Sequence, residues 1–128
     1  MKTKIINPET GIYPPTADYA HAIEVIEAKR TLYISGTMGL EQDGTAGKDL
    51  NGQLDLIWSN ISAILRAAKM NVDNIIRITS YLRDASYAKA NQDARVTALK
   101  GRTVPTTAIV VETLSGDWLV ELEVIAAE

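Results

Sequence analysis

A glutamate lies within an otherwise apolar stretch near the end of the chain, "DWLVELEVIAAE". Burying a bare carboxylate is costly unless another group binds it, so Glu121 calls for an explanation. It could be a solvent-side or subunit-contact residue paired with a cation, which is the commoner role of a glutamate in a strand. It could instead be a partly buried carboxylate that transfers protons in a catalytic site. The residues alone leave both explanations open, and Glu123, on the same side of the predicted strand, weakens the second.

Four further residues could contribute to such a site. The stretch "YISGTMG" places Ser35 and Gly36 at the end of a predicted strand, as an ordinary turn or as a hydroxyl with an open backbone N–H. Tyr19 follows a proline pair in a predicted loop, either as a lid phenol or as an aromatic filling a seam. Asn91 falls on a predicted helix, where a surface or capping amide is the ordinary role. A serine nucleophile is not expected, because the Gly-x-Ser-x-Gly elbow is absent.

Composition argues against several other classes of protein. The chain has no cysteine and a single histidine, His21, so no metal site is expected and His21 is expected to be structural. The glycine spacing fits neither nucleotide-binding motif. A net charge of −3 and scattered basic residues predict no nucleic-acid partner. No window resembles a membrane span or a signal-peptide core, so a cytoplasmic protein without a membrane partner is expected.

The elements that must position these residues follow from hydrophobic periodicity. Apolar positions recur every three or four residues over 50–68, which predicts an amphipathic helix with Asp49 as its N-cap. A second helix is predicted for "SYAKANQDARVTALKG", ending before Gly101. Strands are predicted in "KTKIINP", "HAIEVIEA", "RTLYISGTMGL", "NVDNIIRITSYLRD", "PTTAIVVETL" and "DWLVELEVIA", the second and third as a hairpin. The order β-β-β-α-β-α-β-β predicts a single α+β domain with both helices on one face of a mixed sheet.

The last predicted strand has two unlike faces. Val120, Leu122 and Val124 form an apolar face, whereas Glu121 and Glu123 share the other with apolar neighbours. Two helices can cover the apolar face. The mixed face then needs water or a partner, and association of several copies into a closed ring is the economical solution.

Taken together, these segments resemble the Rid family, also called the YjgF or reactive-intermediate deaminase family. The resemblance covers nearly the whole chain and rests on "QLDLIWSNISAIL", "VDNIIRITSYLRD" and "VELEVIA" in combination. It implies one chorismate-mutase-like domain over residues 1–128. It also implies a homotrimer that binds a small molecule in clefts between subunits.

The resemblance further implies hydrolysis of a reactive enamine or imine to a carbonyl product and ammonia, without cofactor or metal. Glu121 matches the catalytic glutamate that holds and deprotonates the attacking water. Substrate-binding positions are Tyr19, Ser35, Gly36, Asn91, Thr107 and Ile109. An imine carbon is a strong electrophile, so a positioned water and one proton shuttle are sufficient for this reaction.

One position departs from the family pattern. Deaminating members carry an arginine two residues after a proline, where it clamps the substrate carboxylate, and here "PTT" puts Thr107 in that place. Arg102, five residues upstream, is the first alternative clamp to consider. The substitution predicts poor turnover of small α-imino acids and favours another imine substrate. A non-catalytic trimer that binds a metabolite or has a regulatory role is the alternative, and a ribonuclease or translation inhibitor ranks last because the chain is acidic.

Overall fold

The computed structural model describes residues 1–128. The elements, in chain order, are β1 (Lys2–Ile6), β2 (Ala22–Ile26), β3 (Thr31–Met38), α1 (Leu50–Ala67), β4 (Ile75–Leu82), α2 (Ala88–Ala98), β5 (Thr106–Val110) and β6 (Val120–Ala127). Short 3-10 turns precede β4 and α2, at Val72–Asn74 and Ala85–Tyr87. This is the order of strands and helices that the sequence predicts.

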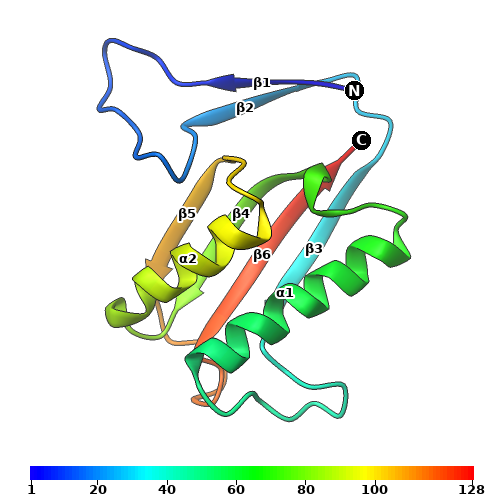
Figure 1. Ribbon diagram of the computed structural model, residues 1–128, viewed down its shortest axis with the longest axis vertical. Coiled ribbons are helices and arrows are strands. Elements are labelled where there is room, and N and C mark those ends of the chain that lie inside the picture. Colours follow the sequence, from blue (N-terminus) through cyan, green and yellow to red (C-terminus); the bar gives the residue numbers. More distant parts are fainter.

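Four of the strands form a mixed sheet in the order β3-β6-β4-β5. The β3–β6 and β4–β6 pairs are antiparallel, and β4 and β5 are parallel because the chain crosses over between them through α2. Both helices lie on the same side of this sheet (Figure 1). The predicted α+β class, with two helices on one face of a mixed sheet, is confirmed. No helix is long and apolar enough to span a membrane.

The predicted pairing of the second and third strands is wrong. β2 pairs with β1 in a separate two-stranded ribbon, with Lys2 opposite Ile26 and Ile6 opposite Ala22 (Figure 1). Between β2 and β3, Glu27 adopts a left-handed backbone conformation (φ 56°), and the N–H of Arg30 donates to the carbonyl of Glu128 at 3.0 Å. The turn therefore leads the chain from the ribbon onto the end of β6 and does not fold it back on β2.

Helix α1 begins where the sequence predicts. Asp49 is the N-cap, and its carboxylate accepts a hydrogen bond from the Gly52 N–H at 2.8 Å. Gln53, one turn into the helix, is buried with its amide satisfied by the backbone carbonyls of Gly47 and Asp117 and by the N–H of Leu119. These bonds tie the start of α1 to the loop that leads into β6, the strand that carries Glu121.

The two faces of the sheet differ as predicted. The helix-side face is fully apolar in β6, where Val120, Leu122 and Val124 are each 0% exposed. The opposite face is not covered by any element of the chain (Figure 1). We call it the open face; by strand alternation and register it carries Tyr33 and Ser35 of β3, Glu121, Glu123 and Ile125 of β6, Arg77, Thr79 and Tyr81 of β4, and Thr107, Ile109 and the following Val111 at β5.

Candidate functional site

Glu121 lies on β6, between Met38 of β3 and Tyr81 of β4 in the register. The β3–β6 pairing is interrupted by a bulge between Ile34 and Thr37, the segment that contains Ser35 and Gly36. Bulges re-aim side chains and are frequent beside active sites. Here the bulge brings the strand backbone under the Glu121 side chain.

The contact between Gly36 and Glu121 is close. A Cβ atom on Gly36 would lie 2.2 Å from the Glu121 Oε2 atom and 2.8 Å from its carboxyl carbon. Real Cβ atoms do not tolerate such distances, so the carboxylate occupies the space that any side chain at position 36 would need. The structure therefore brings Gly36, with Ser35 next to it in the chain, against Glu121, and all three are site residues predicted from the sequence.

Two shallow hollows flank this carboxylate. One, of about 530 Å³, is lined by Ser35 and Gly36 and bounded by Asn60 of α1, whose amide donates to the Met38 and Leu40 carbonyls. The other, of about 250 Å³, contains Glu121 itself with Tyr81 and residues that follow β5. The Tyr81 hydroxyl donates to the Glu123 carboxylate at 2.8 Å, and this hydrogen bond raises the pKa of Tyr81. Glu123 is thus paired, whereas Glu121 accepts no hydrogen bond within the chain.

Tyr19 and Asn91 lie together at the opposite edge of the sheet. They line a hollow of about 230 Å³ beside β5, together with Asp18, Arg95 and Thr106. Asn91 is 3% exposed and its Oδ1 atom has no hydrogen-bond partner. Asn91 does not have the ordinary role of a surface or capping amide, because α2 buries this side chain beside β5. An unpaired buried acceptor is costly, so a donor that reached the Asn91 Oδ1 atom would stabilise it.

A buried ion pair holds the loop that carries Tyr19. The Arg95 guanidinium donates to the Asp18 carboxylate at 2.7 Å and to the Asp18 carbonyl at 2.5 Å, and its side chain is only 5% exposed. Burial alone would raise the pKa of the Asp18 carboxyl, but hydrogen bonds from Thr16 and Arg95 outweigh it and hold that pKa below its usual value. The pair therefore fastens the loop to α2 one residue before Tyr19. This pair could not be predicted from the sequence, because its two members are 77 positions apart.

His21 has the structural role expected of it. Its Nε2 atom lies 2.7 Å from the Tyr13 carbonyl oxygen, and its backbone N–H donates to the Asn7 side chain at 2.8 Å. No group of three or more metal-ligating side chains is present in the chain.

Thr107 and Ile109 lie on β5, both exposed on the open face. The Thr107 hydroxyl accepts a hydrogen bond from Arg77 Nη2 at 3.0 Å. Arg102 makes no hydrogen bond to Thr107. Its guanidinium donates to the backbone carbonyls of Val72 and Ile75, both at 2.8 Å. Arg102 therefore braces the turn before β4 and is not a clamp beside Thr107.

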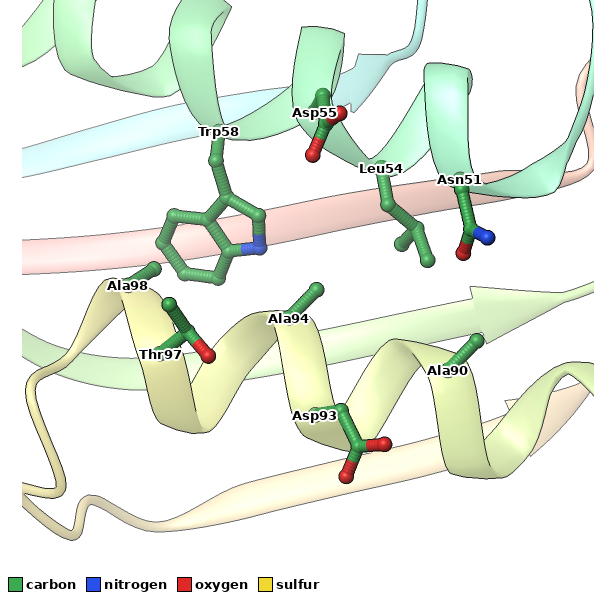
Figure 2. Close-up of a pocket in the computed structure, with 9 residues that line it drawn as sticks. All are labelled: Asn51, Leu54, Asp55, Trp58, Ala90, Asp93, Ala94, Thr97 and Ala98. Atoms are coloured by element: carbon green, nitrogen blue, oxygen red, sulfur yellow. The ribbon is translucent and has the colours of Figure 1, made fainter.

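A further hollow of about 500 Å³ lies between the two helices (Figure 2). The stretch of α2 that faces it presents only short side chains, so the gap to α1 is not filled. Its lining includes Leu54, Asp55 and Trp58 of α1 and Ala90, Asp93, Ala94 and Ala98 of α2. None of the site residues predicted from the sequence lines this hollow, so we place the candidate site on the sheet and its edges.

Known proteins share this arrangement. The family model described as endoribonuclease L-PSP matches residues 11–128. A RutC family protein of Pyrococcus horikoshii is 33% identical over 116 residues, which cover 88% of this chain and 88% of that protein. A RutC family protein of Drosophila melanogaster is 32% identical over 116 residues, with 88% and 80% covered. A solved structure from Yersinia pestis, described as a protein of unknown function of the Rid family, has a TM-score of 0.86 at 27% identity and covers 100% of both chains.

The fold and the site residues together define a small α+β protein whose candidate site residues lie on the uncovered face of a mixed sheet and at its edges. The chain belongs to the family that the matching model describes, the Rid or YjgF family. The resemblance drawn from the sequence is confirmed.

Proposed function

We propose that this protein hydrolyses a reactive enamine or imine to a carbonyl product and ammonia. Membership of the Rid family supports an imine deaminase or a related activity at the level of the family. The observation that carries the proposal for this chain is the Glu121 carboxylate held over Gly36 without a partner of its own. A free carboxylate beside an open backbone is suited to hold a water molecule and take its proton.

In the proposed reaction, the oxygen of that water attacks the imine carbon while Glu121 accepts one of its protons. The electron pair of the C=N bond passes to the nitrogen, which is protonated, and a carbinolamine results. The carbon–nitrogen bond then breaks as the hydroxyl loses its proton, so that ammonia leaves and a C=O bond remains. An enamine enters the same sequence once its carbon has been protonated to give the imine.

We further propose that the site is completed between copies in a homotrimer. Ser35, Gly36 and Glu121 lie at the β3 side of the sheet, whereas Tyr19 and Asn91 lie beside β5. Three strand spacings of about 4.8 Å put β3 and β5 about 14 Å apart, too far for one small substrate to touch both. A ring in which each copy places its β5 edge against the β3–β6 side of the next would join the two groups and cover the open face.

The test supplies freshly generated 2-aminoacrylate and 2-iminobutyrate to the purified protein and follows release of the keto acid and of ammonia. The proposal expects release faster than spontaneous hydrolysis, and loss of the enzymatic part in Glu121→Gln. A protein that binds the keto acid but never accelerates release would instead be the non-catalytic metabolite-binding trimer.

The ribonuclease function in the description of the family model is the third and weakest candidate for this chain. The net charge is −3 and two carboxylates, Glu121 and Glu123, stand on the open face, so the surface repels a phosphate backbone. Incubation with single-stranded RNA is expected to leave the RNA intact.

A further inference from the structure

Arg77 places a positive charge on the open face, next to Thr107. It lies on β4, the second strand from the β5 edge, and pairs with Ile125 of β6 in the register. One of its five N–H donors reaches the Thr107 hydroxyl at 3.0 Å. None of the three ion pairs of the chain includes Arg77. Its charge therefore has no counter-ion within the chain.

The other arginines near the sheet are bound differently. Arg83 donates to the backbone carbonyls of Thr113 and Ser115, and Arg102 donates to two carbonyls before β4. Arg95 is paired with Asp18. Each of these guanidiniums is held by backbone carbonyls or a carboxylate of the chain and has a bracing role. Arg77 alone among them bonds to neither a backbone carbonyl nor a carboxylate, since its one hydrogen bond within the chain goes to the Thr107 hydroxyl.

The Thr107 hydroxyl is oriented by this contact. Because its oxygen accepts the Arg77 N–H, its own hydrogen is free, and the chain offers no acceptor for it. A guanidinium and a hydroxyl thus present donors side by side on one face of the sheet. Ile109, two residues along the same strand and 46% exposed, adds an apolar wall. Two adjacent donors with one positive charge fit the two oxygens of a carboxylate.

We infer that Arg77 and Thr107 together bind the carboxylate of an anionic imine or enamine substrate, with Arg77 supplying the charge that position 107 lacks. This inference rests on the proposed function, because it names the substrate class of the same site. It replaces the sequence-based expectation that small α-imino acids are poor substrates. Arg77 holds the substrate and takes no part in bond making, so the proton transfers assigned to Glu121 are unchanged.

The experiment compares two stable probes, 2-oxobutyrate and its neutral analogue 2-oxobutanamide, by NMR titration of the protein. The wild type is expected to bind the acid at least about tenfold more tightly than the amide. Arg77→Gln is expected to abolish that preference while amide binding stays unchanged, and Arg77→Lys to keep part of it. Arg66→Gln is the matched control, because Arg66 is exposed on α1 and its side chain bonds to nothing in the chain.

Three results would overturn the inference: equal affinity of the wild type for acid and amide, an unchanged preference in Arg77→Gln, or dissociation of the oligomer in that variant. The last result would assign Arg77 to a carboxylate of a neighbouring copy. Failure of the proposed function looks different, since it would leave the acid preference and its dependence on Arg77 intact while no imine is hydrolysed. If Arg77→Gln left the turnover of 2-iminobutyrate unchanged, the proposed function would stand and the inference about Arg77 would fail.

Discussion

The Glu121 carboxylate occupies the space where a side chain at position 36 would be, with Oε2 only 2.2 Å from the position of a Cβ on Gly36. A bulge in β3 and a glutamate on β6 thus depend on each other across the pair of strands. Gly36 does not have a positive φ, so its backbone conformation does not require glycine. The close contact with the Glu121 carboxylate does.

Gly36→Ala should separate activity from stability. The added methyl group would push the flexible end of Glu121 aside, so the free energy of unfolding should change by less than about 1 kcal/mol. The carboxylate would leave its position, and misplacement of about 1 Å can cost about 100-fold in rate. Urea unfolding and imine turnover would be measured beside Gly116→Ala, because a Cβ on Gly116 meets nothing within 4 Å. Full activity in Gly36→Ala would contradict the assigned position of the carboxylate.

Glu121→Gln should remove the proton acceptor while keeping the shape of the side chain. General-base catalysis contributes about 100-fold to 10,000-fold, so kcat on a freshly generated imine should fall by that factor. Binding of 2-oxobutyrate, which needs no proton transfer, should change little. Glu123→Gln is the matched control, since Glu123 lies two residues along the same strand and already accepts from Tyr81. Equal losses in both variants would point to a general effect of charge on the open face.

Much of the fold could be predicted from local pattern. The three- and four-residue spacing of α1, its Asp49 cap and the alternation of Val120, Leu122 and Val124 each depend on neighbouring residues only. The pairing of β2 could not be predicted in this way, because two strand-like runs joined by charged residues favour a hairpin locally. The bonds that decide the pairing join Lys29 and Arg30 to Glu128, at the far end of the sequence.

The candidate site shows the same division. Glu121, Ser35 and Gly36 came from the sequence, but their contact depends on the bulge, which strand alternation does not reveal. The role proposed for Arg77 was not predicted, because its neighbour Thr107 is 30 positions away on a parallel strand. A signal was present, since alternation places Arg77, Thr79 and Tyr81 on the face opposite to the apolar positions of β4. A cation on a strand face that carries both polar and apolar residues is therefore a candidate binding residue.

Val111→Lys should weaken the assembly of copies. Val111 follows β5, continues the alternation of Thr107 and Ile109 and is 39% exposed, so in the proposed trimer it lies at a contact. A charge placed there would be desolvated on association and should raise the dissociation constant at least about tenfold. Light scattering should give three times 13.9 kDa for the wild type and a smaller mass for the variant. Ala63→Lys, at an exposed position of α1 that lines neither hollow beside Glu121, should leave the mass unchanged.

A monomeric wild type at micromolar concentration would contradict the proposed ring. Loss of the trimer in both lysine variants would show that the added charge disturbs folding and does not act at the proposed contact between copies.

Asp18→Ala should destabilise the protein, because it leaves the Arg95 guanidinium buried without a counter-ion. Breaking such a pair from one side costs about 3 kcal/mol of the free energy of unfolding. The control, Asp93→Ala, removes an exposed partner of Lys89 and should cost less than about 0.5 kcal/mol. Urea unfolding of the three proteins at pH 7 makes the comparison.

The same variant has a defined pH dependence. The pKa of Asp18 is lower in the folded protein than in the unfolded chain, so its stabilising contribution is complete above the unfolded value, about 3.9. It is lost as the pH falls through the lower folded value. The difference in unfolding free energy between wild type and Asp18→Ala should therefore shrink below about pH 4. A difference that is constant down to pH 2 would show that the carboxylate charge is not what stabilises the loop.

Thr107→Arg distinguishes a missing clamp from one that Arg77 already supplies. If the site lacked a cation, the new arginine would add about 3 kcal/mol of substrate positioning, or roughly 150-fold in kcat/KM on 2-iminobutyrate. With Arg77 only 3.0 Å from the Thr107 hydroxyl, a second guanidinium there meets a like charge, so we expect a gain of less than about tenfold. In the Arg77→Gln background the same substitution should restore most of the lost kcat/KM, because one cation then replaces the other. A gain near 150-fold in the single variant would show that Arg77 does not hold the substrate, whereas rescue confined to the double variant would show that positions 77 and 107 supply the same charge.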